Sequence, residues 1–133
     1  MSKKTRKYIL FENKVKRGKV SADSDEWEQC FDEGECFAHL YASRNKLPED
    51  FTKYYIVDKF GVTVAHIAAM YGNLPSSFND WELKDSRGFT VAHMASLSHT
   101  LPEDFKEWNI KADNGKTVAE TYASKIPNFA EFF

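Results

Sequence analysis

A repeat of 27 residues constrains the fold more than any other feature of this chain. Four of the six glycines are spaced at that interval without slippage, and the last three of these four are each followed, after one variable residue, by Thr, Val and Ala. A Leu-Pro pair recurs in the first three units, with phenylalanine three residues after each proline. Self-similarity at a fixed period indicates an array in which neighbouring units bury each other's apolar faces. The four glycines of the repeat are Gly34, Gly61, Gly88 and Gly115.

Each unit is predicted to hold two short helices. The threonine is a good N-cap, so a helix is expected from Val64, and Gly72 is expected to end it in the left-handed conformation. The Leu-Pro pair is expected to open a second helix, because proline lacks only an N–H that the first turn leaves unpaired. Aspartate three residues before a glycine predicts the turn between units. We therefore predict an all-α fold, with Ser24–Trp27 as the second helix of an incomplete first unit and with Trp81 and Trp108 in the core.

The run from Asp58 to Gly72, Asp-x-x-Gly-x-Thr-Val-Ala-His-x-Ala-Ala-x-x-Gly, resembles the ankyrin repeat. That family has Thr-Pro-Leu-His where this chain has Thr-Val-Ala-His, and its unit is longer, at about 33 residues. The chain looks like the short variant found in bacterial and phage sequences. The resemblance implies a helix-turn-helix repeat solenoid over residues 21–133. Its parts are a partial cap at 21–33, repeats at 34–60, 61–87 and 88–114, and a C-terminal cap at 115–133, in which Ile126–Pro127 arrives two residues early.

Residues 1–20 fit no repeat and differ from the rest of the chain in charge. They carry eight basic side chains and one acidic, a net charge of +7, whereas the remaining residues have a net charge of −9. This arm is expected to be either a β-hairpin turning at Lys16–Gly18 or disordered. It can contact nucleic acid or an acidic partner. The alternative is a solubilising segment that folds back on the acidic body, and its deletion would then leave helicity and partner affinity nearly unchanged.

Three histidines and two cysteines raise the question of a metal site. His39, His66 and His93 recur every 27 residues, so stacked helices would separate them by roughly 10 Å. Two rings that far apart cannot share one zinc ion at about 2.1 Å each. We expect each histidine to be a hydrogen-bonded structural residue paired with the threonine at its helix start. Cys30 and Cys36 match no zinc signature and are too few for a secreted disulfide framework, so Cys36 is predicted to be a buried small side chain.

No enzyme motif is present. The sequence has no Gly-x-Ser-x-Gly, P-loop, Gly-x-Gly-x-x-Gly or His-Glu-x-x-His pattern. We therefore expect no catalytic residue, metal, cofactor or small-molecule substrate. The longest mostly apolar stretch, Val62–Tyr71, is too short to cross a bilayer, and only four residues separate the basic start from Glu12. Neither a membrane span nor a signal peptide is expected, and the expected location is the cytoplasm.

Positions at which the units differ are the candidates for partner binding. In the ankyrin family, turn tips and inner helices usually hold the partner, and several of those columns are apolar here where a solvated surface would be polar. Aromatic residues, methionine and arginine are favoured at interface centres. The alternative is that the short repeat packs some of them internally or against the arm. The candidates are Lys59, Phe60, Val62, Met70, Tyr71, Arg87, Phe89 and Leu97.

The function expected from these features is protein–protein interaction. The chain would be a rigid adaptor or a stoichiometric inhibitor of a cytosolic protein, and the phage-like repeat indicates a host protein as the target. The alternative is a nucleic-acid-associated protein that binds through residues 1–20. Strongly salt-dependent retention of DNA or RNA would favour the alternative, whereas nuclease-insensitive retention of one protein would favour the first.

Overall fold

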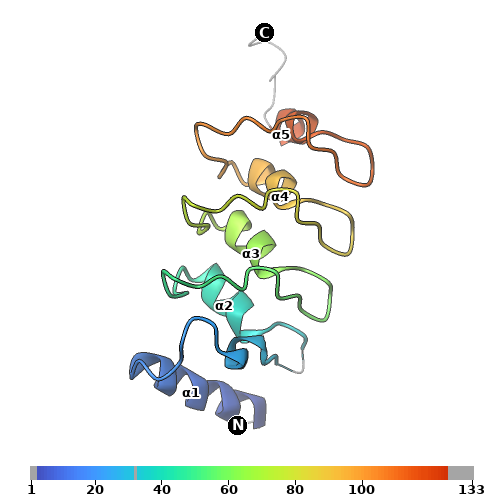
Figure 1. Cartoon of the computed structure of the whole chain (residues 1–133). Helices are drawn as coiled ribbons and strands as arrows, with labels where there is room; N and C mark the ends of the chain where they lie inside the picture. The colour runs from blue at the N-terminus through green and yellow to red at the C-terminus, as the bar shows by residue number, and fades with distance from the viewer. Residues whose placement is uncertain (1–2, 32, 126–133) are drawn as a thin grey trace.

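The computed structural model describes residues 3–31 and 33–125, and Ile126–Pro127 lie outside them. The described residues form helices and loops with no strand, so the all-α prediction is confirmed. None of these helices is long and apolar enough to cross a bilayer. Four helices of the repeating units lie one above another, with loops extending to both sides (Figure 1). The elements are α1 (Lys3–Lys16), a 3-10 helix η1 (Asp25–Glu28), α2 (Phe37–Ser43), α3 (Val64–Met70), α4 (Val91–Leu97) and α5 (Val118–Lys125).

The helices of the repeating units begin and end as predicted. Thr63 Oγ1 accepts a hydrogen bond from the backbone N–H of His66 at the start of α3. Thr90 caps α4 in the same way. Gly72 follows α3 with a φ of 72°, and Asn45 takes the same left-handed position after α2. Each helix packs against the next along the chain, from α2 to α5.

The second helix predicted for each unit is wrong. After the Leu-Pro pair the chain makes one turn, in which the N–H of Phe51 donates to the carbonyl of Pro48 at 3.1 Å, and then runs on without helix. Phe78 and Phe105 repeat this bond. Only η1 is helical in this column of the described residues, and it is a single 3-10 segment. Tertiary packing decides most helix formation in proteins, and here the aromatic side chains of the segment pack edge to face with one another and with the next unit.

Aromatic rings form a continuous column through the Leu-Pro side of the molecule. Successive rings meet edge to face, the favoured geometry for aromatic pairs, with centroids between 5.0 and 5.8 Å apart. Trp27 is fully buried, whereas Trp81 and Trp108, predicted to be core residues, are half-buried. In order, the rings are Phe11, Trp27, Phe51, Tyr54, Phe78, Trp81, Phe105, Trp108 and Tyr122.

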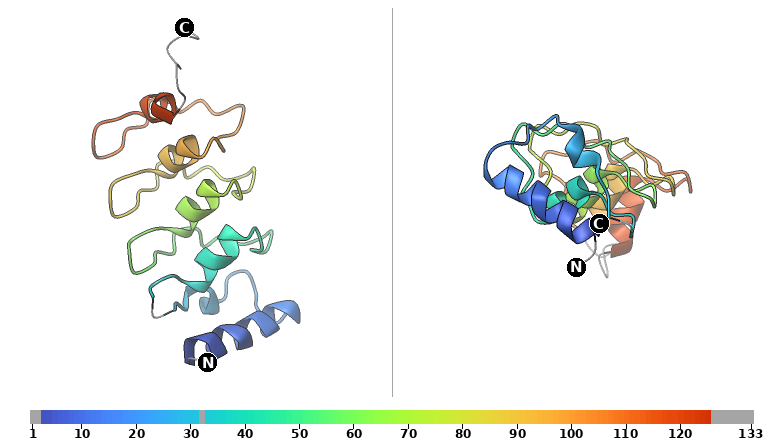
Figure 2. Two further views of the ribbon diagram at one scale, coloured as in Figure 1. Left: turned by 180° about the vertical axis from the view of Figure 1, so that it is seen from behind. Right: turned by 90° about the horizontal axis from the view of Figure 1, so that it is seen from below.

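Residues 3–16 form a helix, so both a β-hairpin and a disordered arm are wrong for this segment. Tyr8, Phe11 and Val15 share one face at helical spacing and pack against the core of the first unit. Phe11 is only 3% exposed. Helix α1 lies across the end of the stack, where it covers an apolar face that no further unit covers (Figure 2). The arm is therefore part of the fold, and we expect its deletion to destabilise the first unit because Phe11 would be removed from the core.

Candidate functional site

Each unit extends a short loop, here called a finger, closed by an antiparallel bridge between its first and last residues. The four fingers line up along one side of the molecule, opposite the Leu-Pro loops (Figure 1). A backbone hydrogen bond links each finger to the next. Lys59 N–H donates to the Gly34 carbonyl at 3.1 Å, and Ser86 and Asp113 donate in the same way to Gly61 and Gly88 at 3.0 Å. The fingers span residues 30–36, 57–63, 84–90 and 111–117.

Aspartate side chains shape the second and third fingers. Asp58 Oδ1 accepts from the backbone N–H groups of Phe60 at 2.9 Å and Val62 at 3.0 Å. Asp85 accepts the equivalent pair of bonds, and its second oxygen binds the Arg87 guanidinium at 2.7 Å. Burial of Asp85 would raise its pKa, but the hydrogen bonds from Arg87 and Phe89, with the nearby His66, together hold the pKa below its ordinary value. These bonds fix the positions from which the candidate side chains project.

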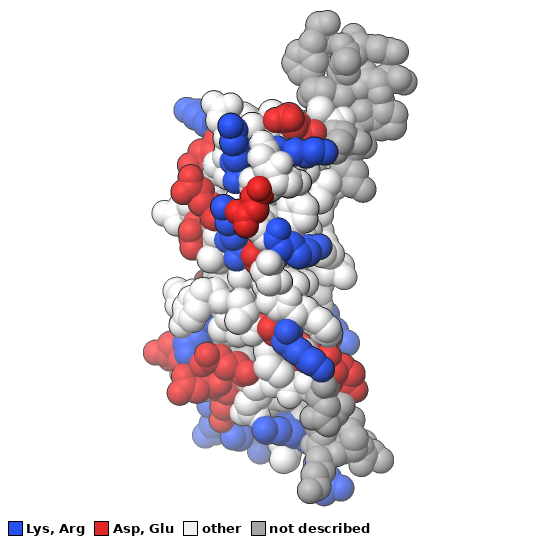
Figure 3. All heavy atoms as spheres, turned by 90° about the vertical axis from the view of Figure 1, so that its right-hand side faces the viewer, with Lys and Arg blue, Asp and Glu red and all other residues white. Residues whose placement is uncertain are grey.

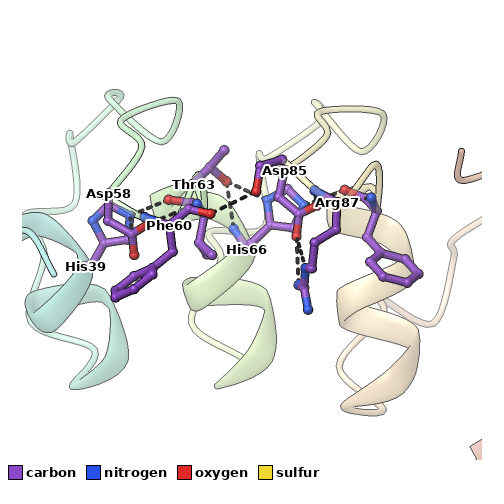
Figure 4. A network of polar contacts seen from close by, with 10 residues as sticks. His39, Asp58, Phe60, Thr63, His66, Asp85 and Arg87 are labelled. Atoms are coloured by element: carbon purple, nitrogen blue, oxygen red, sulfur yellow. Dashed lines mark hydrogen bonds and ion pairs between the residues drawn. The ribbon is translucent and has the colours of Figure 1, made fainter. Parts of the chain in front are cut away.

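His66 ties α3 to the finger of the next unit (Figure 4). Its Nδ1 lies 2.6 Å from Thr63 Oγ1, and its Nε2 lies 2.8 Å from the carbonyl oxygen of Phe89. Because a carbonyl can only accept, Nε2 carries the proton and the threonine hydroxyl donates to Nδ1. His93 repeats the arrangement with Thr90 and the fourth finger. The predicted threonine–histidine pairing is confirmed, and the bond to the next unit is an additional finding.

The first unit departs from this arrangement. Cys36 stands in the threonine column and is buried as predicted, but its sulfur is bonded to that of Cys30 at 2.03 Å. The bond was not predicted, and it forms because these residues face each other across the finger bridge. His39 Nε2 still donates to the carbonyl of Val62 at 2.7 Å, but its buried Nδ1 has no hydrogen-bond partner. Burial lowers the pKa of His39, as it does for His66.

The partner-binding candidates differ in exposure. Phe60 and Tyr71 are 60% and 57% exposed, and Met70 is 39% exposed. Phe60 projects from the second finger, whereas Met70 and Tyr71 lie at the far end of α3, just before the loop to the Leu-Pro side. The other candidates are half-buried (Val62, Phe89 and Leu97) or exposed and charged (Lys59 and Arg87).

Phe60 and Arg87 both point from their fingers toward the helices (Figure 4). The Arg87 guanidinium carbon lies 5.2 Å from the centroid of the Phe89 ring, a cation–π contact. Phe89 is therefore partly covered by a charged group that is itself paired with Asp85. The second finger therefore presents the exposed Phe60 ring, whereas the third finger presents Arg87, which partly covers the Phe89 ring.

Four exposed apolar residues are missing from the predicted set: Ile9 and Leu10 on α1, and two within the repeating units. Tyr55 and Val57 are 59% and 55% exposed. Comparison of columns would have found them, because the equivalent residues of the next two units are polar: Glu82 and Asn109 for Tyr55, Lys84 and Lys111 for Val57.

A groove of about 560 Å³ lies between the second and third Leu-Pro loops. It was not predicted, because helices were expected in these segments. Its floor is apolar and aromatic, and its rim carries Asp104, Lys106 and Glu107. It lies on the side opposite the fingers, so it is separate from the candidates above. Residues of its floor include Leu74, Phe78, Trp81 and Phe105.

Comparisons with known proteins leave the function to be inferred from these residues. No protein-family model matches the chain, and no curated protein is significantly similar to it. Over residues 3–31 and 33–125, no group of three or more His, Cys, Asp or Glu side chains is placed to hold a metal ion. In His66 and His93 both ring nitrogens are already hydrogen-bonded within the fold.

Proposed function

We propose that the chain is a protein-binding module built as an ankyrin-like repeat solenoid, and that its second and third units hold the partner. The observation that carries the proposal is the exposure of Phe60, Met70 and Tyr71, three large apolar side chains within one unit's finger and helix. Phe60 lies on the finger, and Met70 and Tyr71 lie at the other end of α3. Exposed apolar side chains of this size are a solubility cost and commonly belong to interaction sites. Aromatic residues and methionine are also enriched at the centres of protein interfaces.

The bonding between units supports the solenoid part of the proposal. Backbone hydrogen bonds link successive fingers, and His66 and His93 each donate a hydrogen bond to a carbonyl of the next finger. Stacks held by such nearest-neighbour contacts keep equivalent residues at a fixed spacing. A surface of this kind is preorganised, so little conformational entropy is lost when a partner binds.

The roles of the buried histidines favour a rigid adaptor or a stoichiometric inhibitor over an enzyme. The buried histidines serve as hydrogen-bonding links between units. Burial lowers the pKa of His66 and so keeps the ring neutral. The single ring proton is on Nε2, which donates it to the Phe89 carbonyl. Such a group is structural rather than a free general base. The target would be a cytosolic protein, and a host protein if the chain comes from a phage.

Nucleic-acid binding through α1 is the second candidate. The helix exposes Arg6, Lys7 and Lys16, and Arg17 follows it, while Lys14 is paired with Glu26 at 3.0 Å. On the finger side, acidic and basic side chains are intermixed (Figure 3), so a polyanion would be attracted to α1 and not to the fingers. Retention of DNA or RNA that falls steeply with salt and is lost in a variant with Arg6 and Lys7 neutralised would favour this function.

The test of the proposed function compares two tyrosines of nearly equal exposure. The full chain is used to retain a protein from host lysate after nuclease treatment, and the affinity of that protein is then measured for each variant. Tyr71→Ala should weaken binding on the order of 2 kcal/mol with folding nearly unchanged. Tyr55→Ala, on the Leu-Pro side, should leave binding unchanged. Equal losses in both variants, or a Tyr71→Ala effect that arises only through unfolding, would reject the proposed surface.

A further inference from the structure

Cysteine occurs twice in this chain, and both residues lie at the closing bridge of the first finger. Cys30 is exposed and Cys36 is fully buried at the start of α2. In the other fingers the column of Cys36 is threonine, and the column of Cys30 is valine or lysine. The first unit therefore has a bond between the arms of its finger where the other units have a helix-capping hydroxyl.

The disulfide leaves α2 without the polar contacts that α3 has. In the second unit Thr63 Oγ1 accepts from the N–H of His66 at 3.0 Å and lies 2.6 Å from that residue's Nδ1. Cys36, at the equivalent N-cap, makes no side-chain cap bond. His39 Nδ1 is the one buried side-chain nitrogen or oxygen of the described residues that has no hydrogen-bond partner. An acceptor left unsatisfied in the interior destabilises the folded state.

We propose that Cys30 and Cys36 form a thiol–disulfide exchange site, and that reduction lets Cys36 take the place of threonine beside His39. A dithiol supplies the two electrons. One of its thiolates attacks the exposed Cys30 sulfur, the bond to Cys36 breaks, and Cys36 leaves as a thiolate. The second thiol of the reductant then displaces Cys30 and closes a disulfide within the reductant. The two protons of the dithiol end on the two cysteine sulfurs.

The freed Cys36 thiol donates to His39 Nδ1, as the Thr63 hydroxyl does to His66. A thiol is a weaker donor than a hydroxyl, but it satisfies an atom that otherwise has no partner. The ring is already held in the required tautomer, because Nε2 donates to the Val62 carbonyl at 2.7 Å. A hydrogen bond accepted at Nδ1 polarises the ring and strengthens the bond donated at Nε2. Reduction therefore tightens the link between α2 and the second finger, and this step is independent of the proposed function.

The histidine side chains report directly on this exchange. The full chain is prepared with oxidised glutathione and then with dithiothreitol, thiols are counted by a chromogenic disulfide, and the ring nitrogens are observed by ¹⁵N NMR. On reduction two thiols should appear, and the His39 Nδ1 resonance should move toward that of His66, while His66 and His93 stay in place. Release of two thiols with an unmoved His39 resonance would overturn the proposal. So would a chain that forms no disulfide with oxidised glutathione.

Two variants separate the hydrogen bond from the opening of the finger. Cys36→Thr should give a His39 Nδ1 resonance close to that of His66 whether or not reductant is present. Cys30→Ser leaves Cys36 as a free thiol, so its spectrum should match the reduced chain under both conditions. If Cys36→Thr does not fold, Cys30→Ser alone decides the matter. A Cys30→Ser spectrum that matches the oxidised chain at His39 would show that Cys36 makes no bond to this ring.

Discussion

In the middle units, a threonine and the histidine three residues later start a helix and hold the finger of the next unit. Thr63 satisfies an N–H at the start of α3 and donates to His66, which donates in turn to Phe89 of the next unit. The chain of bonds is buried, so every member depends on its neighbour being present. Local sequence rules were enough to predict the Thr63–His66 pair, because capping acts over three residues.

Thr63→Val tests the contribution of this pair to stability. The variant loses the cap and leaves Nδ1 of His66 buried without a donor, so the free energy of unfolding should fall by about 2–3 kcal/mol. Urea denaturation followed by circular dichroism measures the loss. Thr117→Val is the control, because Thr117 pairs with an exposed Glu120 and its removal should cost about 1 kcal/mol. Equal losses would mean that the bond to His66 contributes nothing.

The buried histidines predict how stability depends on pH. Burial lowers the pKa of His39 and His66 from the ordinary 6.5, so below about pH 6.5 the unfolded chain takes up protons that the folded chain does not. Stability should therefore be constant above that pH and fall as the pH drops through 6 toward 5. Urea midpoints at pH 7.5, 6.5 and 5.5 measure the slope, and His66→Gln should reduce it. Stability that rises on acidification over this range contradicts the assignment of neutral rings.

Two features of single residues were not predicted: the disulfide between Cys30 and Cys36, and the exposure of Tyr55. A spacing of six residues does not say which columns face each other across a finger, so the bond between Cys30 and Cys36 needed the three-dimensional register. Tyr55 differs in kind: its exposure follows from polar residues in the equivalent columns, information that the sequence already holds.

Among the elements, the helices beginning at Val64 and Val91 were predicted well and the Leu-Pro segments were not. Proline followed by acidic residues satisfies every local rule for a helix start. These local rules do not include tertiary packing, which decides most helix formation in proteins. Here the aromatic side chains that follow the proline pack into the ring column, and the backbone is not helical. Helix α1 was not predicted, although Tyr8, Phe11 and Val15 have helical spacing, because the surrounding basic residues are typical of a solvated arm.

The role of α1 as a cap is tested by two neighbouring residues. Phe11 is 3% exposed and contacts Trp27, Phe37 and Tyr41 through ring packing, whereas Leu10 is 59% exposed. Phe11→Ala should lower the free energy of unfolding by about 3 kcal/mol or more. Leu10→Ala should change it by less than about 0.5 kcal/mol. If both variants unfold at the same urea concentration as the parent, α1 does not cover the core.

At the scale of the whole molecule, stability comes from contacts between successive units. Helices pack in sequence from α2 to α5, and fingers and aromatic rings are joined in the same order. Where each unit contacts only its neighbours, weakening the contact between two units lets the segments on either side of it unfold separately. The repeat period predicted this order, but not the finger bonds that carry part of it, because those depend on the close approach of two backbones.

Gly61 and Gly115 allow this coupling to be measured. Both have a left-handed φ, 80° and 83°, so alanine at either position carries the same backbone strain of roughly 1–2 kcal/mol. They differ in surroundings: a Cβ at Gly61 would collide with the Ser86 side chain of the next finger, whereas a Cβ at Gly115 would meet nothing within 4 Å. Gly115→Ala therefore measures strain alone, and the additional loss in Gly61→Ala measures the contact between the second and third fingers.

We expect Gly61→Ala to lose at least about 1 kcal/mol more than Gly115→Ala, because separating the fingers also breaks the bond from Ser86 N–H to the Gly61 carbonyl at 3.0 Å. Urea unfolding followed by both tryptophan fluorescence and circular dichroism makes the comparison. In Gly61→Ala the two probes should separate, because Trp27 lies before the weakened contact between the second and third fingers while Trp108 lies after it. Coincident transitions and equal losses in the two variants would mean that the fingers do not couple the units, and that the helices and aromatic column hold the stack alone.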